Sequence, residues 1–178
     1  MNQNEMNEKL QYIFENINNW LNFAEAKNGA LIAINASVIM GIVTDDKIPR
    51  NCIVVTLLIL LAISLFHSLL SFVPLTGNMA EKRLEYWCSK SKAGRNLYLY
   101  SYIAKKYGLN DSEYVNYYND LKQDAGLTTD TINEDKKYLV QEIIYNSKIV
   151  CRKYGLFSRA LLFLGLSVIG FVVTMIIA

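Results

Sequence analysis

The sequence has few of the residues from which most enzyme active sites are built. Among its 178 residues only His67 is a histidine, and the cysteines Cys52, Cys88 and Cys151 have neither CxxC spacing nor a neighbouring histidine. A zinc site would therefore lack ligands both in number and in spacing. The HExxH and GxSxG motifs and a glycine-rich phosphate-binding loop are also absent. We expect a protein that is not an enzyme and that has no metal or catalytic cofactor.

Charge is also scarce. Only 19% of the residues are charged, and the formal net charge is +2. This value is too small for a general nucleic-acid binder, since such proteins neutralise many phosphates at once. We therefore expect no nucleic-acid partner.

Three long apolar stretches dominate the chain. Residues 52–74 carry no formal charge, and residues 156–178 carry only Arg159. Both exceed the roughly 20 helical residues that cross a hydrocarbon core of about 30 Å. The first stretch, about 29–45, is shorter and becomes long enough if its helix begins before Gly29 and Lys27 reaches the interface. The sequence predicts an all-α membrane protein with three transmembrane helices and a helical segment between the second and third.

These stretches divide the chain into four predicted parts. The first 27 residues are polar and amphipathic, so we expect no signal peptide there. The parts are an amphipathic cytoplasmic helix (1–28), a transmembrane hairpin (29–76, with spans at about 29–45 and 52–74), a cytoplasmic helical segment (77–155) and a third transmembrane helix (156–178).

The distribution of lysine and arginine predicts the orientation. Residues 77–155 hold 13 of the 18 basic residues, whereas the linker 45–51 holds two, balanced by two aspartates. Basic loops remain on the cytoplasmic side. We expect a multi-pass protein of the bacterial inner membrane, with the amino terminus and residues 77–155 in the cytoplasm and the carboxyl terminus in the periplasm.

Two helices are predicted inside the polar segment. Asn110 and Glu113 form a capping pattern for a helix over about 111–125, which Gly126 would end. After Thr128 no proline or glycine occurs until Gly155, which favours one long helix that continues into the last span. The alternation LYLYSYI leaves a short strand open as an alternative.

The first span carries a ridge of small residues, which we call the small-residue ridge. Gly29, Ala33, Ser37 and Gly41 recur every fourth position and share one helical face. Such ridges let a second backbone approach closely. The partner could be another span of this chain or a second copy, and we expect a homo-oligomer in contact with membrane lipids.

Polar residues also follow one face of the second span. Ser64, His67, Ser68 and Ser71 lie at i, i+3, i+4 and i+7. His67 and Asn35 of the first span are candidates for a pore lining or a gate, because polar groups in membranes usually face a bundle interior or water. Alternatively, the serines bond carbonyls of their own helix and His67 lies at the interface.

The polar segment begins with a basic cluster. Residues 77–109 contain seven lysines and arginines against two glutamates. Such a cluster beside a membrane attracts anionic lipid headgroups and could equally receive a ligand phosphate.

Several runs resemble one known family. They are residues 19–36 (NWLNFAEAKNGALIAINA), Pro74, residues 108–114 (GLNDSEY) and residues 141–165 (QEIIYNSKIVCRKYGLFSRALLFLG). Together they resemble the transmembrane effectors of bacterial Pycsar antiphage systems. The resemblance implies a protein that stays silent until a partner uridylate or cytidylate cyclase, triggered by phage, makes cyclic UMP or cyclic CMP. The activated effector would impair the inner membrane and stop the growth of the infected cell or kill it.

The resemblance also suggests residues for ligand binding or switching. They are Trp20, Glu25, Lys27, Asn35 and Tyr154, with Arg152 and Lys153 for phosphate. Their ordinary roles would be an interface anchor, a helix-side ion pair, a buried amide and cytoplasmic positive charge. Glu25 stands where related sequences are expected to have aspartate. The remaining alternatives are a holin-like pore former, a ligand-regulated small ion channel and a membrane scaffold.

Overall fold

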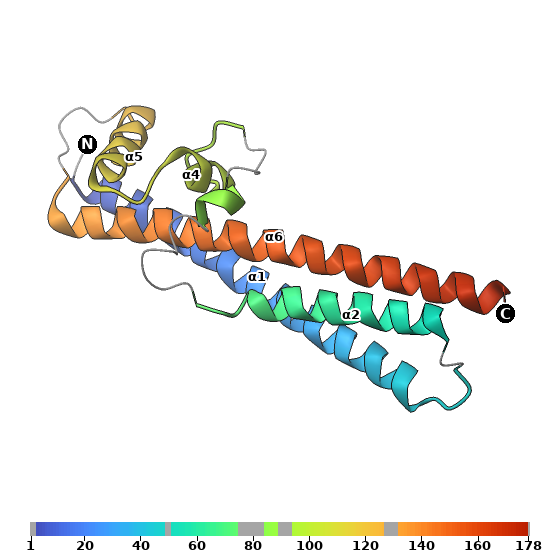
Figure 1. Ribbon diagram of the computed structural model, residues 1–178. Coiled ribbons are helices and arrows are strands. Elements are labelled where there is room, and N and C mark those ends of the chain that lie inside the picture. The colour runs from blue at the N-terminus through green and yellow to red at the C-terminus, as the bar shows by residue number, and fades with distance from the viewer. Residues whose placement is uncertain (1–2, 49–50, 75–83, 89–93, 127–131, 178) are drawn as a thin grey trace. The chain divides into compact units, whose positions relative to one another are not determined.

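Every regular element in the described part of the chain is helical (Figure 1). The computed structural model describes residues 3–48, 51–74, 84–88, 94–126 and 132–177. The helices are α1 (Gln3–Thr44), α2 (Cys52–Leu70), α4 (Tyr100–Lys106), α5 (Asp111–Asp124) and α6 (Glu134–Ile177), with a further helical turn at 84–88. The all-α prediction is confirmed. The LYLYSYI run enters α4, so its alternation does not form a strand.

Three helices are long and apolar enough to cross a membrane. Among the described residues they are α1, α2 and α6, and each overlaps one of the stretches predicted from the sequence, although α2 ends at Leu70, before the predicted end at 74. The amphipathic amino-terminal segment and the first apolar stretch form one uninterrupted helix, α1. Likewise α6 runs from Glu134 to Ile177 without a break, as the lack of proline predicts.

Side-chain caps explain where two helices begin. Asn51 accepts a hydrogen bond from the Val54 backbone N–H at 3.0 Å and starts α2. Asn110 accepts one from the Glu113 N–H, also at 3.0 Å, and starts α5 where the capping pattern predicts. Gly126 follows the end of α5 with a φ of +67°, a conformation that glycine adopts without strain.

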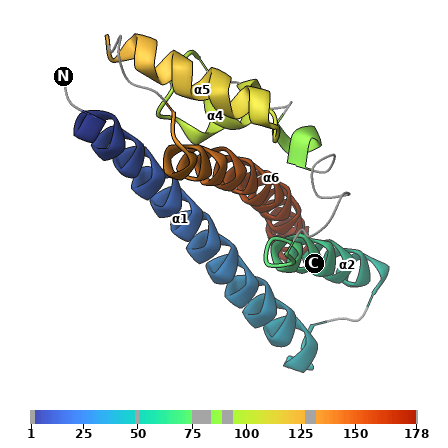
Figure 2. The same cartoon turned by 90° about the vertical axis from the view of Figure 1, so that its left-hand side faces the viewer.

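The chain divides into two compact units. We call Met1–Phe23 with Leu75–Arg152 the first unit, and Ala24–Pro74 with Lys153–Ala178 the second unit. In the first unit, α4 and α5 lie beside the early turns of α6, as both ribbon views show (Figures 1 and 2). In the second unit, the core is apolar and contains Leu31, Ile42, Val54, Leu61, Ala160 and Leu164.

Candidate functional site

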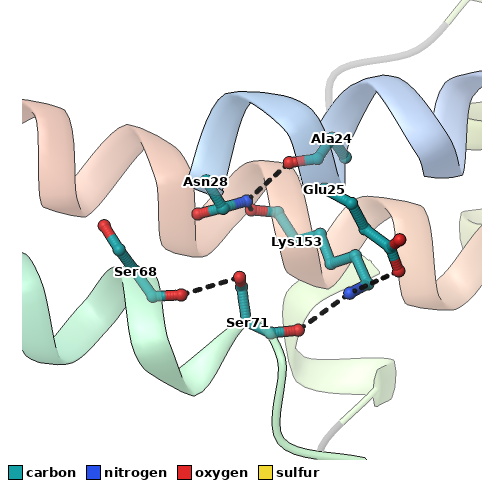
Figure 3. Close-up of polar contacts among 6 residues, drawn as sticks. All are labelled: Ala24, Glu25, Asn28, Ser68, Ser71 and Lys153. Atoms are coloured by element: carbon teal, nitrogen blue, oxygen red, sulfur yellow. Dashed lines mark hydrogen bonds and ion pairs between the residues drawn. The ribbon is translucent and has the colours of Figure 1, made fainter. Parts of the chain in front are cut away.

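The second unit contains a buried lysine on α6 that contacts the other two helices of the unit, α1 and the end of α2 (Figure 3). The Nζ atom of Lys153, on α6, lies 3.1 Å from Oε1 of Glu25 on α1. It also donates a hydrogen bond of 2.9 Å to the backbone oxygen of Ser71, the residue that caps the end of α2. The carboxyl end of a helix carries partial negative charge and so favours a cation. The lysine side chain is 8% exposed, whereas that of Glu25 is 45% exposed.

Asn28 completes this arrangement, which we call the Lys153 cluster (Glu25, Asn28, Ser71 and Lys153). Its Nδ2 donates to the Ala24 oxygen at 2.9 Å and to the Lys153 oxygen at 3.4 Å. Its Oδ1 atom is buried and has no hydrogen-bond partner among the described residues. An unsatisfied buried acceptor costs about 1–3 kcal/mol, so the cluster carries an energetic penalty that a different packing could relieve.

Lys27 and Tyr154 lie together in the same unit. The Lys27 ammonium is 5.4 Å from the centroid of the Tyr154 ring and 5.5 Å from that of Phe157. Cation–π contacts of this kind contribute about 0.5–2 kcal/mol. Glu25 thus pairs with Lys153, which is distant in the sequence, whereas Lys27 on the same helix as Glu25 lies over two aromatic rings.

The remaining predicted switching residues lie elsewhere. Trp20 belongs to the first unit, where its ring centroid is 5.5 Å from that of Tyr100. Arg152 is also in the first unit and is largely buried. Asn35, in the second unit, is fully buried and donates to the Leu31 oxygen at 2.8 Å, while its Oδ1 lacks a partner among the described residues. Glu25, Lys27, Lys153 and Tyr154 thus form the group that the second unit brings together.

One serine of the polar stripe on α2 bonds α6, and the other two bond their own helix. Ser64, fully buried, donates a hydrogen bond of 2.7 Å to the Ala160 oxygen across the helix pair. Ser68 and Ser71 donate to the Ser64 and Ser68 oxygens of their own helix, at 3.2 and 2.7 Å. These bonds agree with the alternative in which the serines bond carbonyls, except that Ser64 bonds the neighbouring helix. In the membrane, polar side chains commonly join helices in this way.

His67 is half-buried at the edge of the same stripe. Its Nδ1 lies 2.9 Å from the Ile63 oxygen, and its ring centroid is 5.6 Å from that of Phe163. The imidazole therefore contacts a backbone oxygen of its own helix and an aromatic ring of α6.

In the part of the chain that the structure describes, the small-residue ridge lies outside the buried face of α1. Ala33, Ser37 and Gly41 are exposed, and a Cβ atom added at Gly29 or Gly41 would meet no neighbouring atom within 4 Å. The buried face of α1 in this unit instead consists of Ala24, Asn28, Leu31, Asn35 and Ile42. At about 100° per residue, the ridge lies on roughly the opposite side of α1 from this face.

Titratable groups of the first unit form two smaller clusters. Lys106 and the Tyr107 hydroxyl both bond Asp120. Burial alone would raise the pKa of the Asp120 carboxyl, but the bonds from Lys106 and Tyr107 outweigh it and lower that pKa. Burial and the Asp120 bond raise the pKa of the Tyr107 hydroxyl.

Cys88 and Cys151 pack together with Ala104 as free thiols. The hydrogen bond between the two sulfurs and the nearby Lys148 charge lower the pKa of Cys88, and the same bond together with burial raises the pKa of Cys151. Among the described residues no group of three or more His, Cys, Asp and Glu side chains could hold a metal ion.

One comparison with known proteins identifies a family. The family model of the Pycsar effector protein domain matches residues 9–178. No curated protein and no solved structure matches this chain.

Proposed function

The chain belongs to the Pycsar effector family, and from this premise we propose that it responds to a cyclic pyrimidine mononucleotide, cyclic CMP or cyclic UMP, by impairing the integrity of the bacterial inner membrane. The antiphage role follows from the family. The signal and the damage to the membrane are our proposal, and the outcome for the infected cell is growth arrest or death. The functional partner is a uridylate or cytidylate cyclase that acts through its diffusible product.

The observation that carries this proposal is the family match over a chain with three candidate spans and an apolar exterior on the second unit. Large apolar side chains stay exposed along α2 and the later turns of α6, for example Phe66, Ile169 and Ile176. A surface of this kind is stable against lipid and unfavourable in water. The effector would therefore act from within the membrane.

The Lys153 cluster is our candidate for the element that switches. One ammonium joins three helices, so moving it changes the contacts of all three. A ligand can shift such an equilibrium only by its difference in affinity for the two states. The unbonded buried oxygens of Asn28 and Asn35 raise the free energy of this packing. They therefore reduce the difference in binding free energy between the two states that a ligand must supply.

We propose further that the small-residue ridge joins copies of this chain in the membrane. Ala33, Ser37 and Gly41 are exposed, Gly29 is partly exposed, and the ridge faces away from the buried face of α1. Close approach of backbones is what small residues permit. The excess of basic residues in 77–155 supports a cytoplasmic location for this segment and for the amino terminus, on the side where the nucleotide would be made.

Membrane potential tests the proposal directly. We expect cells that produce this chain to depolarise when cyclic CMP or cyclic UMP is produced with it, and to keep their potential without either nucleotide or with cyclic AMP. A potential-sensitive dye gives the readout, and cells with an empty vector and the same cyclase control for the nucleotide alone. Depolarisation in the absence of any nucleotide would instead favour a holin-like pore former, and an unchanged potential under all conditions would favour a scaffold.

A further inference from the structure

A cavity of about 300 Å³ lies in the first unit, between the helical turn at 84–88, the end of α4 and α6. This volume is at the lower end of the range of small-ligand sites, about 300–1,000 Å³. Its wall includes Glu85, Cys88, Lys105, Lys106 and Lys148. Three cationic side chains and one carboxylate thus border a space large enough for a small molecule.

Lys148 is the unusual member of this wall. It is only 3% exposed, and its Nζ donates a hydrogen bond of 3.0 Å to the Ala104 oxygen. No carboxylate lies within ion-pair distance of it in the described ranges. A buried ammonium usually has an anionic partner, because its removal from water costs several kcal/mol. Lys148 therefore has a buried positive charge without a carboxylate to balance it.

The other charges of the wall do not supply that balance. Asp120 lies outside the wall, where it bonds the wall residues Lys106 and Tyr107. Glu85 is exposed, and no ion pair to Lys148 forms. The Lys148 ammonium bonds the backbone oxygen of Ala104, and Ala104 packs in one cluster with Cys88. Both groups border the cavity.

We propose that this cavity binds a small molecule that carries a phosphate group, and that Lys148 pairs with the phosphate. A charge-assisted hydrogen bond of this kind is about twice as strong as a neutral one. The identity of the ligand, a cyclic pyrimidine mononucleotide, rests on the proposed function, whereas the site itself rests on the cavity and on the unbalanced charge of Lys148. The headgroup of an anionic phospholipid has the same chemistry and is the second possible source of the phosphate.

Alkylation of Cys88 provides a test that needs no change at the site. The full chain is purified and reconstituted into phosphatidylcholine vesicles, and N-ethylmaleimide labelling of Cys88 is followed by peptide mass spectrometry. We expect cyclic CMP or cyclic UMP to slow this labelling at least about tenfold, as a ligand above its Kd excludes the reagent. Inorganic phosphate at millimolar concentration should slow it less. If labelling proceeds equally with each nucleotide, with phosphate and in phosphatidylglycerol vesicles, the proposed site is wrong.

A pair of variants tests the role of Lys148. Lys148→Met removes the charge and keeps the length of the side chain, and we expect it to weaken nucleotide binding by about tenfold to a hundredfold in calorimetry. Lys122→Met, in a half-exposed position on α5 outside the cavity wall, removes the same charge and should change the Kd by less than twofold. The melting temperature of Lys148→Met should stay equal or rise, because an unbalanced buried charge is lost. Equal Kd values for the two variants would overturn the role of Lys148.

The outcomes separate this inference from the proposed function and separate the two sources of phosphate. Slower labelling in phosphatidylglycerol vesicles without nucleotide would support a phosphate site and assign it to lipid headgroups. Depolarisation by a nucleotide that neither protects Cys88 nor responds to Lys148→Met would refute the site and leave the function standing. Protection of Cys88 without depolarisation would support the site and refute the proposed function.

Discussion

The two units of this chain have opposite exteriors. Among the described residues, all but five of the exposed large apolar side chains belong to the second unit. The five in the first unit are Tyr12, Phe23, Tyr86, Val115 and Tyr138. Three of these five are tyrosines, whose hydroxyl can reach water. The exterior of the second unit fits a lipid solvent, and that of the first unit fits water.

Their interiors differ as well. In the first unit, buried and partly buried side chains bond one another as well as the backbone: Tyr107 bonds Asp120, and Asn146 bonds Asn18. In the second unit the interior hydroxyls and amides bond backbone oxygens, as Ser64 does with Ala160 and Ser167 with Leu57 at 3.0 Å. Carbonyl oxygens are the polar groups that a helical bundle in lipid always contains. The contrast indicates that each interior is built for the solvent around it.

We expect the largest effect from substituting a lysine on the exterior of each unit and comparing the amounts of protein in the membrane fraction. Ile169 and Tyr138 lie on the same helix, α6, and are 64% and 62% exposed. Ile169→Lys should reduce the amount of full-length protein in the membrane fraction at least about tenfold, because a lysine near the middle of a span costs about 3 kcal/mol. Tyr138→Lys should leave the amount unchanged, since surface substitutions in water change stability by about 0.5 kcal/mol or less. Quantitative immunoblots measure both variants, and equal amounts would contradict the assignment of the two solvents.

The Lys153 cluster should give the next largest effect. Glu25→Gln leaves the Lys153 ammonium, 8% exposed, without its carboxylate. We expect a loss of about 2 kcal/mol, less than for a fully buried pair because Glu25 is 45% exposed. For a chain of this size that loss lowers the melting temperature in detergent by about 4–8 °C.

Two further variants control this measurement. Glu8→Gln, at an exposed position on the early turns of α1, should change the melting temperature by less than about 1 °C. The double variant Glu25→Gln with Lys153→Met should recover much of the loss, because it leaves no unpaired charge in the interior. A double variant no more stable than Glu25→Gln would show that the ion pair is not the cause of the loss.

A substitution in the small-residue ridge should have the smallest effect on the stability of the single chain, but it should visibly reduce assembly. Gly41→Leu fits the isolated chain, because a Cβ atom there has nothing within 4 Å, but it fills a surface that we propose to lie against a second copy. Overpacking of a close contact costs about 1–3 kcal/mol, so crosslinked oligomers in membranes should decrease. Val43→Leu adds apolar volume at an exposed site off the ridge and should leave the crosslinking pattern unchanged. Equal patterns for both variants would argue against assembly through the ridge.

Much of the fold could be predicted because its signals are local. Apolar stretches of sufficient length predicted the three candidate spans, and Asn110 and Gly126 predicted the two ends of α5. The roles of the individual site residues could not be predicted to the same extent. The serine stripe of α2 was visible as a pattern, but whether Ser64 bonds its own helix or α6 depends on which helix lies beside it. The sequence does not distinguish Lys148 from the other 12 basic residues of 77–155, since its burial has no signal in the sequence.

The sequence by itself therefore determined the helical class, the number of candidate spans and the family of this protein, because helix formation and membrane insertion depend on the composition and period of contiguous residues. Only the tertiary structure decided which polar groups meet. Glu25 pairs with Lys153 rather than with Lys27, the small-residue ridge faces outward, and Lys148 lies buried beside a cavity. These outcomes depend on contacts between segments far apart in the chain, and several pairings of the same residues would satisfy the local pattern equally well.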